Sequence, residues 1–307
     1  MHSWKMLREE NMMHPYVLTT CSTADRTEAQ FKERNVPYVC FHFTISDTEY
    51  MDDLGKSVPF DVFYQRMANG EMTKTSQVNT DEFVSFFTPF LEQGQDIIHL
   101  CLSAGISGVI NSARVAKEIL EEQFPERKIY IIDSYAASAG LGLLVDRLAD
   151  LRDEGYSVDE LAAWAIEHRL ECNHWFFTTD LTYLIRGGRV SRTSGFIGNV
   201  LGICPLLNVN NEGKLIARKK IRGKSRVIRE IVKTMEKHAE GGKEYSGKCF
   251  ISNSACYEDA RAVADLIEAA FPKLNGKVEI TEIGTTIGSH TGPGTVAVFF
   301  WGDERTE

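Results

Sequence analysis

The chain has 307 residues, of which 43% are hydrophobic and 25% are charged, and its net charge is −9. This composition is typical of a globular protein with one large or two ordinary domains, and it excludes a mainly disordered chain. The negative charge disfavours nucleic acid as a partner, because such binding needs clustered lysine and arginine, and no apolar run reaches the roughly 18 residues of a transmembrane segment.

The first half of the sequence predicts strands that alternate with helices. Short apolar runs that fit buried strands lie at residues 16–20, 38–43, 96–102 and 128–133. Amphipathic or small-residue stretches that fit helices lie at residues 59–69, 81–92, 109–124 and 136–151. Strands and helices in this alternation imply right-handed β-α-β crossovers. We therefore expect an α/β domain with a mainly parallel sheet and flanking helices.

The pattern changes in the second half. Ser157 and Glu160 form a capping-box signature for a helix at residues 158–170. Beyond it, strands are predicted at residues 174–179, 205–210, 214–221, 248–253, 277–282 and 295–301, and helices at 227–238 and 257–271. The strands at 205–221 fit a β-hairpin. We expect two domains, residues 14–168 and residues 169–303, the second an α/β domain with a mixed or antiparallel sheet.

Seven scattered cysteines form no CxxC pair, so the ligand spacing of a zinc site or of a redox motif is missing. Several lie in apolar strand-like runs, where a free thiol is a small core residue. Residues 1–13 lack the apolar core of a signal peptide. These features predict a cytoplasmic protein without a bound metal.

Three stretches approach nucleotide-binding or catalytic motifs, and each lacks a required glycine. Residues 223–225 could end a P-loop, but Arg218 stands where the upstream glycine is needed. Residues 140–145 begin a dinucleotide fingerprint and residues 105–109 begin a nucleophile elbow, and both end in valine instead of glycine. Each missing glycine permits a sharp turn or a close backbone approach. Nucleotide binding is therefore disfavoured.

Hydroxyl side chains gather in two segments that precede predicted helices. Thr75 and Ser76 lie in MTKTSQ, and Ser107 lies beside Gly108 in LSAGISG. Open parallel sheets bind ligands beyond the carboxyl ends of their strands, and helix N-termini favour anions. We expect the two segments to hold a carboxylate or a phosphate. The alternative is that Thr75 and Ser107 only cap helices.

Three glycines surround His290 and Thr291 in the predicted turn GSHTGPG, which suggests a backbone shaped to bring an imidazole close to a ligand. A plain turn is the alternative. His99 lies in an apolar strand and is expected in the core. Arg189, in GGRVS, is either structural or close to an anion. The acid-free basic run at 214–229 either steers a negatively charged partner or forms a solvated face.

Together these segments resemble the DegV family of fatty-acid-binding proteins. The family pattern is matched in order by TSQ at 75–77, LSAGISG at 102–108, IDS at 132–134, LIRGGRVS at 184–191 and GSHTGPG at 288–294. The resemblance spans about residues 16–301. It implies a two-domain bacterial protein that holds a long-chain fatty acid in a tunnel near the domain junction. It also implies a partner, a separate fatty acid kinase catalytic subunit that phosphorylates the carboxylate for phospholipid synthesis.

The resemblance carries over residue by residue. Thr75 and Ser107 match hydroxyls that bind the carboxylate, and His290 matches a histidine near the same group. Arg222 stands where a basic residue near the kinase-facing end is expected. The ligand-binding residues expected altogether are Thr75, Ser76, Ser107, Gly108, Arg189, Arg222, His290 and Thr291. One departure is Cys21-Ser22, where the family has Asp-Ser, which leaves the role of this turn open.

The predicted function is binding without catalysis and without a cofactor other than the bound fatty acid. Candidate tunnel-lining residues, for which ordinary core is the alternative, are Phe83, Phe86, Phe87, Phe90, Phe196, Ile197, Val200 and Leu201. A second hypothesis is a serine acyl hydrolase or small-molecule-processing enzyme with Ser107 as nucleophile and His290 as base, but no acid stands at a recognisable spacing to orient His290. A transcription regulator is disfavoured by the net charge.

Overall fold

The computed structural model describes residues 15–191 and 202–307, and within those residues the strands form three sheets. The first is a parallel sheet whose strands, in spatial order, are β2 (Tyr38–Val39), β1 (Tyr16–Cys21), β6 (Asp96–Cys101) and β7 (Ile129–Asp133). The predicted parallel sheet is confirmed.

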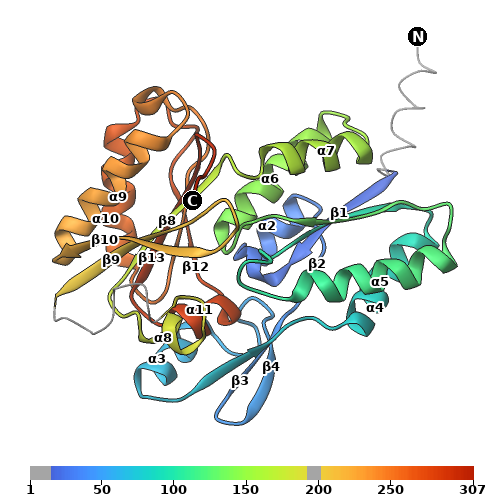
Figure 1. The fold of residues 1–307 in the computed structure, drawn as a ribbon, viewed down its shortest axis with the longest axis horizontal. Coiled ribbons are helices and arrows are strands. Elements are labelled where there is room, and N and C mark those ends of the chain that lie inside the picture. The colour runs from blue at the N-terminus through green and yellow to red at the C-terminus, as the bar shows by residue number, and fades with distance from the viewer. Residues whose placement is uncertain (1–14, 192–201) are drawn as a thin grey trace.

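Helices cover both faces of the parallel sheet. One face packs against α4 (Thr80–Glu92) and α5 (Val109–Gln123), and the other against α2 (Glu28–Glu33), α6 (Ala139–Asp153) and α7 (Val158–His168) (Figure 1). A strand that is buried on both faces needs apolar residues at nearly every position. That requirement explains why β6 is apolar except for Asp96 at its start and His99.

The second sheet is mixed and has six strands. In spatial order they are β10 (Leu215–Arg222), β9 (Ile203–Val209), β8 (Cys172–Thr178), β13 (Thr295–Trp301), β11 (Phe250–Asn253) and β12 (Glu279–Glu282). Only the β11–β12 pair is parallel among these described strands. α9 (Lys224–His238) and α10 (Tyr257–Ala270) cover one face. The predicted mixed sheet and the β9–β10 hairpin are confirmed.

The third sheet was not predicted. It is antiparallel, with strands β4 (Thr48–Met51), β3 (His42–Ile45) and β5 (Thr73–Ser76), and α3 (Phe60–Ala68) connects β4 to β5. The single strand predicted at 38–43 is wrong, because β2 and β3 belong to different sheets. The segment MTKTSQ, for which no strand was predicted, contains β5, because Thr73–Ser76 pairs with β3.

α6 lies between the two larger sheets. It contacts β1 of the parallel sheet and also β8, β11 and β13 of the mixed sheet. Most of its residues are buried, including the charged Asp146 and Arg152. Gly140 is needed here, because a Cβ at this position would lie 2.4 Å from Cε1 of His174. The predicted boundary after residue 168 falls between α7 and β8 and stays a prediction of how the chain divides.

α11 (Thr285–Thr291) packs against the third sheet, α3 and the short helix α8 (Thr182–Arg186), although it follows β12 of the mixed sheet. Two buried aspartates hold its start. Asp25 accepts a hydrogen bond from the Gly284 amide at 2.9 Å, and Asp52 accepts one from the Thr285 hydroxyl at 2.7 Å. Ser22 donates to Asp52 at 3.0 Å, so the Cys21-Ser22 turn supports this junction. No helix in the described ranges is long and apolar enough to cross a membrane.

Candidate functional site

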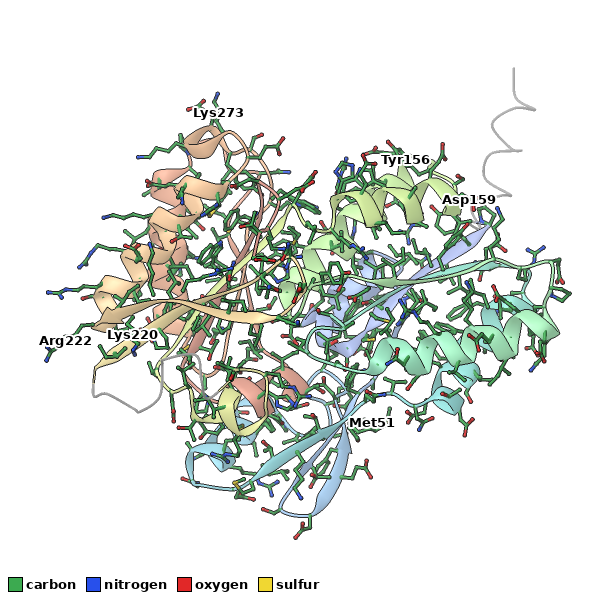
Figure 2. The ribbon with its side chains drawn as sticks, viewed as in Figure 1. Met51, Tyr156, Asp159, Lys220, Arg222 and Lys273 are labelled. Carbon is green, nitrogen blue, oxygen red and sulfur yellow. The ribbon has the colours of Figure 1, made fainter. Side chains whose placement is uncertain are left out.

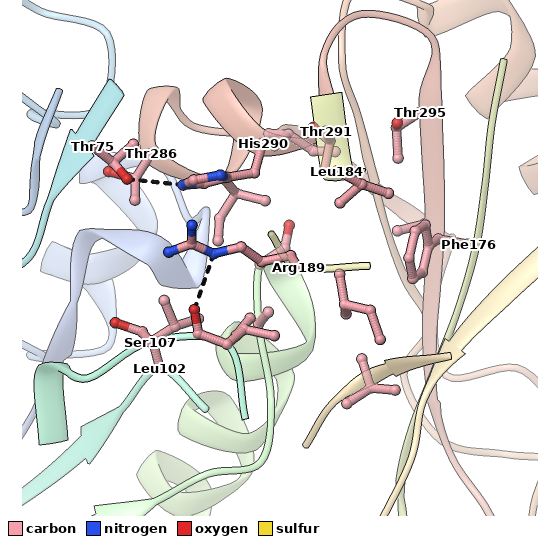
Figure 3. A pocket seen from close by; sticks show the side chains of 18 of the residues that line it. Thr75, Leu102, Ser107, Phe176, Leu184, Arg189, Thr286, His290, Thr291 and Thr295 are labelled. Atoms are coloured by element: carbon pink, nitrogen blue, oxygen red, sulfur yellow. Dashed lines mark hydrogen bonds between the residues drawn. The ribbon is translucent and has the colours of Figure 1, made fainter. Parts of the chain in front are cut away.

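A cavity of about 390 Å³ lies where the mixed sheet, α11, β5 and the loop after β6 meet (Figure 3). Its volume is within the range of about 300–1,000 Å³ that small-molecule sites usually have. Its apolar lining residues are Phe41, Leu102, Ile106, Ala137, Phe176, Leu184, Val209, Leu215, Ile283, Ile287, Ala297 and Phe299. The polar lining groups gather mainly at the end formed by β5, α11 and the start of α5.

Thr75 and His290 meet at this polar end. Thr75 stands opposite Phe43 in the β3–β5 register, and directly opposed residues project from the same face of a sheet, here the face that packs against α11. The Thr75 Oγ1 lies 2.8 Å from Nε2 of His290 (Figure 3). Gly187 permits this placement of the ring, because a Cβ there would lie 2.3 Å from Nδ1 of His290.

His290 is a neutral imidazole at ordinary pH. Burial, with a smaller effect from the nearby positive charge of Arg189, lowers the pKa of His290 to about 4. His290 lies on helix α11, so the expectation that GSHTGPG is a turn is wrong at this residue. Among the described residues its Nδ1 has no hydrogen-bond partner. The ring therefore has one nitrogen bound to Thr75 and one that is enclosed beside Gly187.

Ser107 and Gly108 form the lower side of the polar end. The Ser107 Oγ accepts a hydrogen bond from the Val109 amide at 3.3 Å, so the capping alternative holds in part. Gly108 is the N-cap residue of α5 and has no side chain of its own to cap that helix. The first turn of α5 therefore leaves amide groups near the cavity, and the positive end of its dipole favours an anion there.

Arg189 extends across the cavity between these two groups (Figure 3). Its Nε donates to the Ile106 carbonyl at 3.2 Å, and its Nη1 donates to the Gly187 carbonyl. Burial lowers the pKa of Arg189, but a guanidinium stays charged in proteins. Within the described part of the chain no acidic side chain pairs with Arg189 or lines the cavity. Its positive charge is held by carbonyl dipoles and is not neutralised.

The structure brings Thr75, Ser76, Ser107, Gly108, Arg189, His290 and Thr291 to one cavity. It does not bring Arg222 there, because this exposed residue lies at the end of β10, at the far edge of the molecule (Figure 2). Ser103, which also stands in LSAGISG, is buried and donates to the Gly213 carbonyl at 2.9 Å, so its role is structural.

The predicted apolar lining is wrong for the four candidates that the structure describes. Phe83 and Phe87 are fully buried and pack edge-on against His99, which confirms His99 as a core residue. Phe86 and Phe90 pack against that core and do not line the cavity. The remaining candidates, at residues 196–201, lie outside the described residues. The observed lining comes from strands and loops that the sequence pattern predicts only as core.

Sequence reasoning missed His174, Gln77 and Thr286, which also line the cavity. His174 had a detectable signal, because it stands between Cys172 and Phe176 on one face of β8 as a titratable group between two apolar neighbours. In the described ranges no three His, Cys, Asp or Glu side chains are arranged to hold a metal ion.

The comparisons with known proteins decide the family. Residues 16–303 match the sequence model described as "Uncharacterised protein, DegV family". The chain belongs to the DegV family. A DegV domain-containing protein from Clostridium perfringens is 37% identical to it over 293 residues, which are 95% of this chain and 99% of that protein.

Solved DegV structures share the whole fold. A DegV family protein from Thermus thermophilus, described as binding fatty acid, has a TM-score of 0.83 and 26% identity, with 94% of this chain and 99% of that chain covered. The fatty acid kinase (Fak) B3 protein of Streptococcus pneumoniae, in a structure loaded with linoleic acid, has a TM-score of 0.80 and 22% identity, with 94% and 99% covered. The predicted DegV resemblance and the predicted fold class are confirmed.

Proposed function

We propose that this DegV protein binds a long-chain fatty acid, with the carboxylate at Thr75, Ser107 and His290 and the alkyl chain along the mixed sheet. The observation that carries the proposal is the charge of Arg189, which no acid in the described residues neutralises, at one end of a mainly apolar cavity. An amphipathic anion can place its negative charge beside Arg189 and its apolar part against the apolar lining. The fatty acids bound by the relatives described above support the same ligand class.

The alkyl chain supplies most of the affinity. Each buried methylene contributes about 0.8 kcal/mol, so about fourteen of them supply roughly 11 kcal/mol before the costs of association. The contacts to the carboxylate then need to orient the ligand more than they need to add binding free energy. Neutral hydroxyls and free helix amides suit this task, since they hold the oxygens without a bidentate ion pair.

The same arrangement suits presentation of the acid to a separate fatty acid kinase. Such a kinase transfers the γ-phosphoryl group of ATP to a carboxylate oxygen, which yields an acyl phosphate and ADP. The DegV protein would only position the carboxylate, and the kinase would carry out the phosphoryl transfer. Support comes from Ser76 and Gly108, which border the cavity and are exposed to solvent, and from the structural likeness to a fatty acid kinase B3 protein.

The acyl hydrolase alternative is less well supported. A serine hydrolase needs a histidine hydrogen-bonded to the nucleophile and an acid that orients the histidine. Here Nε2 of His290 is bound to Thr75, and the Ser107 hydroxyl is engaged with the Val109 amide. No carboxylate lines the cavity among the described residues. This arrangement favours binding over covalent catalysis.

Mass spectrometry of the purified protein tests the proposal. Under native conditions we expect a complex with a fatty acid, and under denaturing conditions we expect the mass of the unmodified chain. An acyl adduct on Ser107 would support the hydrolase instead. A protein that carries no fatty acid and takes up none from solution would overturn the proposed ligand.

A further inference from the structure

His174 is a polar side chain in the apolar part of the cavity. It lies on β8, opposite Phe299 of β13, and the next pair along the same face is Phe176 with Ala297. All four line the cavity. The His174 ring packs edge-on against Phe299, with centroids 5.2 Å apart and planes at 89°. The polar end that holds His290 is thus not the only place where the cavity offers a hydrogen-bonding group.

His174 lies in the part of the cavity that β8 and β13 line. Its neighbours on that face, Phe176, Ala297 and Phe299, are apolar. Phe176 lies on the opposite side of the cavity from Thr75 and Ser107 (Figure 3). A ligand group that reaches His174 therefore belongs to the hydrocarbon chain of an acid whose carboxylate is at the polar end.

Both ring nitrogens of His174 are buried, and neither has a hydrogen-bond partner among the described residues. The side chain is only 1% exposed. A buried polar group without a partner is destabilising, and native proteins usually satisfy such groups. Gly140 of α6 packs so closely against the ring that a larger residue at this position would clash with His174.

The chemistry of the ring selects its partner. Burial lowers the pKa of His174 well below its usual range, with a smaller effect from the charge of Arg305, so the imidazole is neutral. A neutral imidazole presents one N–H donor and one nitrogen acceptor. An anion would gain little from it, whereas a hydroxyl group can both donate and accept.

We propose that His174 forms a second polar subsite that recognises a hydroxyl group carried on the acyl chain. The substrate class is then a long-chain fatty acid with a hydroxyl substituent well away from its carboxylate. The proposal rests on the fatty-acid-binding function proposed above and adds to it a preference within that class.

The test measures the dissociation constants of stearic acid and of a positional series of monohydroxylated stearic acids. The wild-type protein should bind at least one hydroxylated isomer about three- to tenfold more tightly than stearic acid, the effect of one hydrogen bond between neutral groups. His174→Leu should abolish this preference, and His174→Gln, which keeps a donor and an acceptor, should retain it. Phe176→Leu, on the same face of the same strand, is the matched control and should affect all the acids alike.

A wild-type protein that binds stearic acid but prefers it to every hydroxylated isomer would overturn the subsite and leave the proposed function intact. A preference that survives in His174→Leu would also overturn it. Failure to bind any of the acids would overturn both proposals. Thermal unfolding checks that His174→Leu is folded, and its stability should not fall, because the substitution removes an unpartnered polar group. If that variant is unfolded, loss of the preference in His174→Gln is the result that contradicts the subsite.

Discussion

Thr75 and Ser107 offer hydroxyl groups to the cavity, and this choice of donor determines how a carboxylate would be held. Each hydrogen bond to a charged group contributes about 1.5–3 kcal/mol, so Thr75→Val combined with Ser107→Ala should raise the Kd for a fatty acid at least about a hundredfold. Isothermal titration with the acid and with the corresponding alkane checks this. The alkane should bind both proteins equally, and an equal loss for alkane and acid would refute recognition of the carboxylate.

His290 should make the stability of the ligand-free protein depend on pH. Its pKa falls from an ordinary 6.5 in the unfolded chain to about 4 in the fold. The unfolded state therefore binds more protons between these values, and the stability that His290 contributes above pH 6.5 is lost as the pH falls towards 4. After allowance for the partial exposure of the ring, the loss is about 2 kcal/mol.

Urea unfolding at a series of pH values measures this effect. His290→Gln should flatten the pH dependence between pH 6.5 and 4 without removing it, because burial also lowers the pKa of His99, to about 3. An unchanged slope in His290→Gln would show that the ring is solvated in the folded protein.

The loop after β6 packs against the turn of the β9–β10 hairpin, and this contact closes one side of the cavity. A Cβ on Gly105 would lie 2.4 Å from the Gly213 carbonyl oxygen, which is a backbone atom and cannot rotate away. Gly105→Ala should therefore separate the loop from the hairpin and lower the free energy of unfolding by about 1–3 kcal/mol.

Thermal and urea denaturation measure the effect of Gly105→Ala. Gly108→Ala in the same loop is a matched control, because its Cβ would meet only the flexible Gln77 side chain, at 3.0 Å. The control should lose less stability. Equal losses in the two variants would mean that the loop and the hairpin are not in tight contact.

Elements with a strong hydrophobic period were predictable from the sequence, and short elements held by distant contacts were not. The apolar run of β6 and the capping box at Ser157, whose hydroxyl accepts from the Glu160 amide, gave local signals that the structure confirms. The β3–β4 hairpin gave no such local signal. Its turn is Ser46-Asp47, with positive φ at both residues, in place of the usual Asn-Gly.

The candidate site was predictable in part of its residues but not in its geometry. Thr75 and His290 lie 215 residues apart in the chain, and no periodicity indicates that a β-strand and a short helix bring them within hydrogen-bonding distance. The glycines around His290 suggested a turn. One of them, Gly288, instead lets α11 approach Tyr64, since a Cβ there would lie 2.4 Å from the tyrosine oxygen.

Across the whole molecule, charge is distributed unevenly. The chain carries a net charge of −9, yet residues 214–229 of β10 and the start of α9 contain no acid. Lys219 and Lys220 are exposed on β10, and Lys219 pairs with Glu230 of α9 at 2.6 Å. Surface pairs of this kind add little stability. A basic face on an acidic protein is suited to steering a negatively charged partner towards it.

If the fatty acid kinase docks on this face, reversing its charge should impair phosphorylation and leave fatty-acid binding unchanged. We expect Lys219→Glu with Lys220→Glu to lower the rate of acyl phosphate formation about tenfold at low salt, and the difference should shrink at high salt as screening increases. Lys273→Glu, an exposed lysine far from β10 (Figure 2), is the control and should leave the rate unchanged. A normal rate in the double variant, with the Kd for the acid also unchanged, would show that the basic run is only a solvated surface and that the kinase binds elsewhere.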